Sequence, residues 1–299
     1  MKTLIIILGP TAVGKTSLAI DIAREFNSEI ISADSRQFYR ELKIGTATPT
    51  LKELNKIKHH FVGNLSINDY YNVSKYESEV IAFLKSYYKN HDFAVMTGGS
   101  GLYINAVCNG ISDLPDPDEK LRQQLKETYK TEGLKPLKER LQKLDPDYYR
   151  VVDLRNPNRI IRALEVCITT GRTFSSQRIT KPKTRDFEIL KIGLRRPRKE
   201  LFARIESRVE EMISQGLVEE VKGLTRYRNL NSLNTVGYKE IFKYLDDEWT
   251  LEKAIEKIKT STRRYAKRQL TWFKKDEDIH WFHPDDLEKI VTFINNYKN

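Results

Sequence analysis

Cysteine is scarce in this sequence, and that scarcity excludes two kinds of site. The 299-residue chain contains only Cys108 and Cys167. Both lie in apolar stretches typical of helices, and neither has a neighbour at a metal-ligand spacing. A disulfide framework and a zinc site are therefore not expected, and we predict a reducing, cytoplasmic compartment.

Long hydrophobic runs are also missing. The longest uninterrupted aliphatic run extends from Leu4 to Leu8. A membrane-spanning helix needs about 20 apolar residues, and the core of a signal peptide needs roughly 7 to 15. We expect neither a membrane partner nor an export signal. The sequence shows no internal repeat or low-complexity tract, so its 39% apolar and 31% charged content predicts a globular protein of one or two domains.

Acidic residues are outnumbered by basic ones, and the excess is local. The chain has 52 Lys and Arg against 41 Asp and Glu, a formal charge of +11. Residues 253–275 contain nine basic residues and one acidic residue, which is +8 in this stretch alone. Such clustering favours a polyanionic partner such as nucleic acid. A solvated helix face is the alternative interpretation.

The spacing of apolar residues predicts alternating strands and helices. Strands are expected at 3–8, 29–33, 93–97, 189–194 and 280–283, and helices at 16–26, 74–90, 198–214 and 251–274. Alternation of nearly continuous apolar strands with amphipathic helices is typical of a doubly wound parallel sheet. We therefore predict an α/β fold with a doubly wound parallel sheet.

Residues 114–184 follow a different pattern, with helices separated by proline and glycine. Pro117 precedes one helix, Asn156-Pro157 begins another, and Gly171 ends it. We predict a helical insertion domain at 114–184 within an α/β core made of 1–113 and 185–299.

The segment from Gly9 to Thr16, GPTAVGKT, matches the P-loop pattern G-x-x-x-x-G-K-[ST]. It lies between a predicted strand and a predicted helix, which is the context that the motif requires. The predicted α/β fold is therefore of the P-loop NTPase-like kind. Its backbone amides and the helix amino terminus attract phosphate, Lys15 neutralises charge, and the Thr16 hydroxyl can bind Mg²⁺. A glycine-rich turn without a ligand is the alternative.

A P-loop indicates phosphate but not a reaction. Nucleotide hydrolases usually place an acid at the end of a buried strand to hold the metal, yet strand 93–97 runs into Gly98-Gly99. Asp34 instead follows the second strand, at its carboxyl end. It is either a carboxylate in the phosphate crevice or a turn cap formed together with Ser35.

Two further features allow a functional and a structural interpretation. Arg204 and Arg208 lie four residues apart on one predicted helix. They either neutralise a leaving phosphate or pair with Glu206 and Glu211 at the surface. The last predicted helix interleaves its basic residues with aromatic ones, which suits a phosphate backbone and unstacked bases. Those aromatic residues are Tyr265, Trp272 and Phe273, and core packing is the alternative for them.

Seven segments together resemble one family, the bacterial tRNA dimethylallyltransferases, or tRNA isopentenyltransferases. They are GPTAVGKT (9–16), ISADSRQFYRELKIGTATP (31–49), TGGSGLY (97–103), NPNRIIRALEV (156–166), ARIESRVEEMISQGLVEEV (203–221), TVGYKE (235–240) and TRRYAKRQLTWFKK (262–275). Ser100 stands where the family usually has threonine, which keeps a hydroxyl group. The zinc-finger extension of eukaryotic members is not found, so the bacterial type is expected.

The resemblance implies transfer of the dimethylallyl group from dimethylallyl diphosphate to N6 of adenine 37, beside the tRNA anticodon. The product would be N6-(dimethylallyl)adenosine, with release of diphosphate. It implies Asp34 as general base, and Arg208, Lys15 and Thr16 with Mg²⁺ at the diphosphate. The donor-binding residues implied are Gly9, Pro10, Thr11, Ala12, Val13, Gly14, Lys15 and Thr16.

The resemblance also implies a tRNA surface that binds the anticodon stem-loop, on a protein expected to be a monomer. The matching positions are Asp34, Ser35, Arg36, Gln37, Ser100, Arg122, Asn158, Arg159, Ile160, Ile161, Arg162, Asn234, Thr235, Val236, Gly237, Tyr238, Lys239, Lys267, Arg268, Gln269, Leu270, Thr271, Trp272, Phe273 and Lys274.

Three rival functions share part of these features. A small-molecule or nucleoside kinase would use the P-loop and the strand-end aspartate, but it leaves the basic last helix unexplained. A nucleotide-gated RNA-binding protein would account for the charge and leave Asp34 without a role. An enzyme that prenylates free adenine nucleotides would need no tRNA surface.

Overall fold

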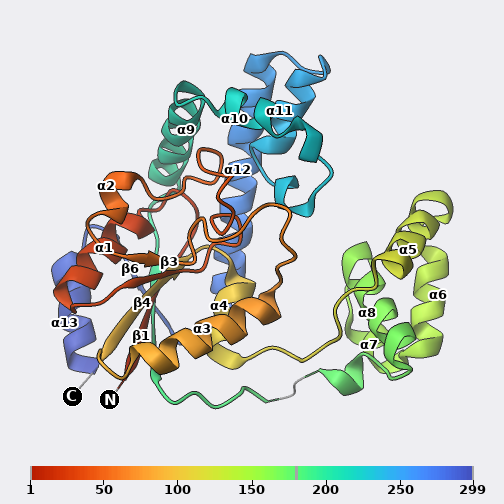
Figure 1. Ribbon diagram of the computed structural model, residues 1–299, viewed down its shortest axis with the longest axis horizontal. Coiled ribbons are helices and arrows are strands. Elements are labelled where there is room, and N and C mark those ends of the chain that lie inside the picture. The colour runs from red at the N-terminus through yellow and green to blue at the C-terminus, as the bar shows by residue number, and fades with distance from the viewer. Residues whose placement is uncertain (1, 179–180, 298–299) are drawn as a thin grey trace. The chain divides into compact units, whose positions relative to one another are not determined.

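The computed structural model describes residues 2–178 and 181–297. The chain forms two compact units, shown in Figure 1. One comprises Met1–Cys108 and Thr184–Asn299, and the other comprises Asn109–Lys183. In the described part of the chain, no helix is both long and apolar enough to cross a membrane.

A six-stranded sheet forms the centre of the first unit. Its strands are β1 (Thr3–Leu8), β2 (Ile30–Ser32), β3 (His59–His60), β4 (Phe93–Gly98), β5 (Glu188–Leu194) and β6 (Ile279–Phe282). They lie in the order β3-β2-β4-β1-β5-β6, and all neighbours are parallel. The predicted parallel α/β fold is confirmed. The sequence pattern missed β3, because two residues are too few for any periodicity.

Helices cover both faces of this sheet and extend beyond one end of it. They are α1 (Lys15–Glu25), α2 (Leu51–Leu54), α3 (Val73–Tyr87), α4 (Gly101–Asn109), α9 (Arg198–Ser214), α10 (Leu217–Gly223), α11 (Tyr238–Leu245), α12 (Leu251–Phe273) and α13 (Leu287–Tyr297). Short 3-10 turns occur at Ser175–Gln177, Thr225–Tyr227 and Asn231–Leu233.

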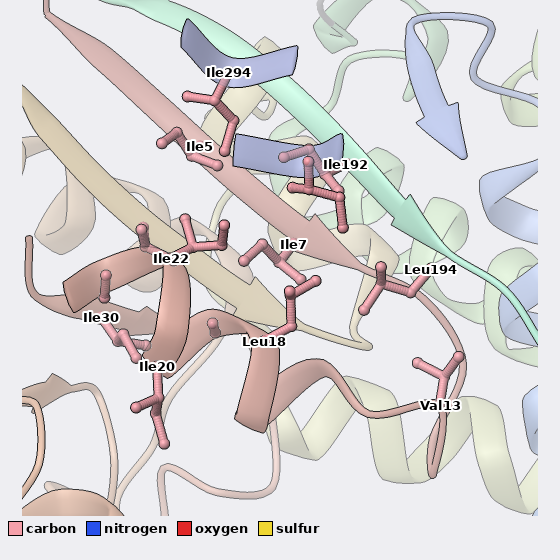
Figure 2. Packing of buried hydrophobic residues seen from close by; sticks show 14 of the residues in the cluster. Ile5, Ile7, Val13, Leu18, Ile20, Ile22, Ile30, Ile192, Leu194 and Ile294 are labelled. Atoms are coloured by element: carbon pink, nitrogen blue, oxygen red, sulfur yellow. The ribbon is translucent and has the colours of Figure 1, made fainter. Parts of the chain in front are cut away.

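The side-chain alternation of β1 divides the interior into two cores. Ile5 and Ile7 pack with α1 and α13 on one face. Figure 2 shows these two side chains with Leu18 and Ile22 of α1. Leu4, Ile6 and Leu8 point to the opposite face and pack with α3 and α4. A strand buried on both faces explains why its sequence is continuously apolar.

A third core lies among α9, α10, α11 and α12, which gather at one end of the first unit in Figure 1. Tyr39 and Leu42, from the long segment after β2, also enter this core. The segment after β2 is therefore held to helices that follow it by more than 150 residues, as the bond from the Lys43 N–H to Glu220 of α10 across 177 positions illustrates.

The second unit is a small helical domain with its own core. It contains α5 (Glu119–Glu132), α6 (Lys135–Leu144), α7 (Pro146–Val151) and α8 (Pro157–Thr170). The predicted ends of α8 are confirmed: the Asn156 side chain accepts a bond from the Arg159 N–H, and Gly171 ends the helix with φ of 67°. This left-handed backbone conformation favours glycine.

Candidate active site

The carboxyl ends of β2, β4 and β1 lie side by side, because these strands are neighbours in one parallel sheet. Ligands of such sheets bind at this edge. Three segments lie at these strand ends: residues 9–16 directly after β1, residues 34–37 one residue beyond β2, and residues 98–101 from the last residue of β4 onward. The sheet thus brings together the predicted phosphate loop, the predicted base and the glycine-rich turn.

The loop from Gly9 to Thr16 has the backbone shape that its glycines permit. Gly9 has φ of 150°, and a side chain there would come within 2.8 Å of the Leu194 carbonyl oxygen. Gly14 has φ of 114° and directly precedes α1. The helix therefore begins at Lys15, and its positive amino terminus lies at the loop.

Three arginines hold the loop from one side. Arg196 Nε donates to the Val13 carbonyl at 2.9 Å, and Arg204 Nε donates to the Ala12 carbonyl at 2.8 Å. Arg208 Nη1 donates to Thr11 Oγ1 at 3.3 Å. Arg204 and Arg208 therefore both contact the phosphate loop, a choice between the two alternatives that their spacing left open.

Two details of this arginine cluster were not predicted. Glu206, a suggested partner for these arginines, instead forms a 2.7 Å ion pair with Arg263 of α12. Sequence reasoning missed Arg196, which follows β5. Its position just beyond the end of a buried strand is the signal that could have indicated it.

The charges at the loop influence one another strongly. Lys15 Nζ donates to the Pro10 carbonyl at 2.7 Å. Burial and, to a smaller extent, the positive charge of Arg208 lower the pKa of Lys15, the negative charge of Asp34 opposes both effects, and the resulting pKa is about 7. Burial and Arg204 also lower the pKa of Arg208. Partly buried cations whose charges repel one another favour a bound anion, which would relieve their repulsion.

Asp34 caps a turn by itself, because Ser35 bonds instead to Ser100. Its Oδ1 accepts a bond from the Arg36 N–H at 3.0 Å, and its carbonyl accepts one from the Gln37 N–H at 3.2 Å. The carboxylate therefore caps its own turn. Its charge also acts on both Lys15 and Arg208. The turn thus holds the Asp34 carboxylate at the phosphate loop.

Gln269 of α12 joins two of the strand-end segments. Its Oε1 accepts a bond from the Thr11 N–H at 2.9 Å, and its Nε2 donates to the Gly99 carbonyl at 2.9 Å. The side chain is buried, with 6% exposed. A side chain on Gly99 would come within 2.2 Å of Gln269 Nε2, and one on Gly101 within 2.3 Å of Trp272 Nε1. The glycines of the turn therefore make room for α12.

The outer face of α12 is basic, with one exposed aromatic ring. A hollow of about 380 Å³ is lined by Arg264, Lys267, Arg268, Thr271, Trp272 and Lys275. Trp272 is 44% exposed. This combination of cations and an indole ring suits phosphates and an unstacked base.

The structure separates the predicted tRNA-contact residues by exposure. The exposed ones are Asn158, Arg159, Asn234, Lys239, Lys267, Arg268, Thr271, Trp272 and Lys274. Those of intermediate exposure are Asp34, Ser35, Arg36, Gln37, Ser100, Arg122, Arg162, Thr235, Val236 and Leu270. The buried ones are Ile160, Ile161, Gly237, Tyr238, Gln269 and Phe273.

Four of the buried residues need a different interpretation. Ile160 and Ile161 pack in the core of the helical unit, and Phe273 packs against the sheet. Tyr238 is fully buried in the third core. These side chains are almost inaccessible to a ligand, because each lies on the apolar face of its helix. We therefore assign them to packing and not to direct tRNA contact.

The residues at the loop also fit the magnesium expectation. Within residues 2–178 and 181–297, no group of three or more His, Cys, Asp and Glu side chains is placed to hold a metal ion. Thr16, in the first turn of α1, offers one hydroxyl oxygen. Mg²⁺ commonly takes few protein ligands and completes its shell with substrate phosphates and water, so the Thr16 hydroxyl and a bound diphosphate would suit it.

Together, these features define an α/β protein with a parallel sheet, in which a cationic loop and a carboxylate lie at the carboxyl ends of the strands. Residues 37–276 match the family described as IPP transferase. The chain belongs to this family.

A relative from Bacteroides fragilis named tRNA dimethylallyltransferase 1 is 52% identical over 293 residues, covering 98% of this chain and 97% of the relative. Among solved structures, the tRNA isopentenylpyrophosphate transferase from Bacillus halodurans matches with a TM-score of 0.73 at 34% identity, covering 99% of this chain and 96% of that one. A eukaryotic dimethylallyltransferase acting on tRNA matches with a TM-score of 0.79 at 28% identity, covering 96% of this chain and 75% of that one.

Proposed function

We propose that this protein transfers the dimethylallyl group of dimethylallyl diphosphate to N6 of adenine 37 in tRNA and releases diphosphate. The observation that carries the proposal is that the sheet brings Asp34, beyond β2, to the same edge as the phosphate loop after β1, where its charge acts on Lys15 and Arg208. The names of the relatives support the substrates, since the protein 52% identical to this chain is a tRNA dimethylallyltransferase.

The phosphate loop and its cations serve the leaving group. The allylic carbon–oxygen bond breaks, and its electron pair goes to the diphosphate. Lys15, Arg208 and the amino terminus of α1 stabilise the charge that develops there. Bound Mg²⁺, held by the Thr16 hydroxyl and phosphate oxygens, would add further neutralisation.

Asp34 serves the nucleophile. The adenine amine is weakly nucleophilic, because its lone pair is delocalised into the ring. As the bond from N6 to the allylic carbon forms, the amine proton passes to Asp34 Oδ2. The Arg36 N–H keeps Oδ1 engaged, so the carboxylate has a defined orientation. General-base assistance of this kind typically contributes about 10²- to 10⁴-fold.

The basic outer face of α12 serves the RNA. The target base must leave the stack of the anticodon loop to reach Asp34, which requires surface for its neighbours and their phosphates. Lys267 and Arg268 provide charge, and Trp272 provides a ring for stacking. We extend the proposal to the anticodon stem-loop as the bound part of tRNA, to a monomeric protein and to a cytoplasmic location.

Transfer of label tests this function directly. The protein is incubated with dimethylallyl diphosphate labelled in the prenyl group, Mg²⁺ and bulk tRNA, and in parallel with AMP in place of tRNA. We expect label in tRNA, at N6 of adenine 37 after nuclease digestion, and none in AMP. Hydrolysis of ATP by the same preparation without tRNA labelling would contradict the proposal and favour a kinase.

A further inference from the structure

Glu220 of α10 accepts four hydrogen bonds with one carboxylate. Its Oε2 accepts from the Lys43 N–H at 3.0 Å and the Ile44 N–H at 2.8 Å. Its Oε1 accepts from the Gly45 N–H at 3.0 Å and from the Tyr238 hydroxyl at 2.6 Å. Bonds to a charged acceptor are about twice as strong as those between neutral groups. One side chain thus holds three consecutive amides of the segment that follows β2.

The surroundings of this carboxylate are built to fit it. A side chain on Gly45 would come within 2.5 Å of the Tyr238 ring, so only glycine fits there. Tyr238 is fully buried, and burial, followed by the negative charge of Glu220, raises its pKa. Its hydroxyl therefore stays protonated and continues to donate to Glu220.

From this anchor a continuous series of bonds leads to Asp34. The anchored amides begin the loop 43–48, and the carbonyls of Thr46 and Ala47 accept from Gln37 Nε2 at 3.2 Å and 3.1 Å. The Gln37 N–H in turn donates to the Asp34 carbonyl at 3.2 Å. Hydrogen bonds at both ends of the loop 43–48, joined by the loop backbone and by Gln37 itself, therefore link Glu220 to the turn that carries Asp34.

We propose that Glu220 and Tyr238 are positioning residues for the transfer reaction, which they serve by fixing the loop 43–48 and, through Gln37, the Asp34 turn. This inference rests on the proposed function. It also gives Tyr238 a role that replaces direct contact with tRNA. The residues touch neither substrate in this account, so their effect falls on the rate of transfer and not on substrate affinity.

The test compares Glu220→Gln with Glu219→Gln. Glu219 is exposed and is the neighbour of Glu220 on the same helix. Both variants lose one negative charge, so their general electrostatic effect on tRNA is matched. In Glu220→Gln, the amide NH₂ group replaces one carboxylate oxygen and faces groups that donate hydrogen bonds, so bonds that this oxygen accepted are lost. We expect single-turnover transfer to fall roughly tenfold or more, because small displacements of reacting groups have effects of this order or larger. The affinities for donor and tRNA should stay within about threefold.

Hydrogen exchange on the same proteins locates the effect. Glu220→Gln should speed exchange of the peptide containing residues 43–45 and leave β1 and α1 unchanged, whereas Glu219→Gln should change neither exchange nor rate. Tyr238→Phe, which keeps the ring, should slow transfer by a smaller factor. The double variant should be no slower than Glu220→Gln, because the hydroxyl acts through the carboxylate.

Two results would overturn the inference: unchanged exchange at 43–45 in Glu220→Gln, or a parental transfer rate despite faster exchange there. If Glu220→Gln does not fold, Tyr238→Phe with a parental rate and parental exchange overturns it as well. Failure of the proposed function would be seen separately, as a parent protein that transfers no label to tRNA.

Discussion

Replacing Gln269 with leucine separates two roles for the α12 helix. The resemblance placed this residue near tRNA, whereas the structure buries it between the phosphate loop and the turn after β4. Leucine has a similar size and removes both hydrogen bonds. The Thr11 N–H and the Gly99 carbonyl then lose their partner, and the exposed residues around Trp272 remain in place.

The size of the effect follows from these two groups. An unsatisfied buried polar group costs about 1–3 kcal/mol, so two groups together cost roughly 2–6 kcal/mol. Thr11 is only half-buried, which favours the lower part of this range. Because 1.4 kcal/mol corresponds to about a factor of ten in affinity, we expect donor binding to weaken about tenfold or more. The melting temperature should fall by at least about 4 °C.

The assay measures two dissociation constants for each protein, one for the diphosphate donor and one for tRNA. Gln269→Leu should weaken donor binding and keep tRNA binding within about threefold. Lys267→Ala, on the exposed face of the same helix, is the control. It should weaken tRNA binding and keep donor binding within about threefold. The reasoning is refuted if Gln269→Leu binds the donor normally and loses tRNA, since Gln269 would then act on the RNA.

Three further predictions follow from the site. Asp34→Asn keeps an oxygen for the Arg36 N–H but cannot accept a proton, so single-turnover transfer should fall by about 10²-fold or more with both substrates still bound; a near-parental rate would remove Asp34 from the mechanism. Since the pKa of Lys15 is about 7, its charged form is lost as pH rises through 7, and donor affinity should weaken between pH 7 and 9. Calorimetry should detect proton uptake when the donor binds. Lys15→Arg should give a donor affinity that does not change with pH over this range. Arg268→Ala should lower the slope of log tRNA affinity against log salt by about one unit if Arg268 contacts one phosphate. The control, Arg24→Ala on α1, should leave the slope unchanged. Equal slopes for the parent and Arg268→Ala would show that Arg268 contacts no phosphate.

Much of the fold could be predicted because its signals are local. Continuous apolar runs indicated β1 and β4, and helical spacing indicated α1, α3, α9 and α12. Asn156 and Gly171 marked the ends of α8. Each of these signals lies within a few residues of the element that it predicts, since it reflects backbone preferences and the period of a strand or helix.

The site was predicted in part for the same reason. Gly9 to Thr16 is a continuous motif, and Asp34 directly follows a predicted strand, whereas the order of strands within the sheet was seen only in the structure. The spacing of Arg204 and Arg208 placed them on one helix face. Whether that face met the phosphate loop or water was decided only by the packing of α9 against the sheet.

The remaining features depend on contacts that leave no local pattern. Gln269 meets Thr11 across 258 positions, and Glu220 meets Gly45 across 175. In both cases a side chain binds a backbone amide, and any residue except proline offers such an amide, so the sequence of the partner segment carries no mark of the contact. The burial of Tyr238 likewise depends on helices that assemble only in the folded chain. The sequence by itself determined the phosphate loop, the succession of strands and helices along the chain, and the carboxylate at a strand end. Only the tertiary structure decided which side chains hold the loops around Asp34, because those hydrogen bonds join groups that folding alone brings within reach.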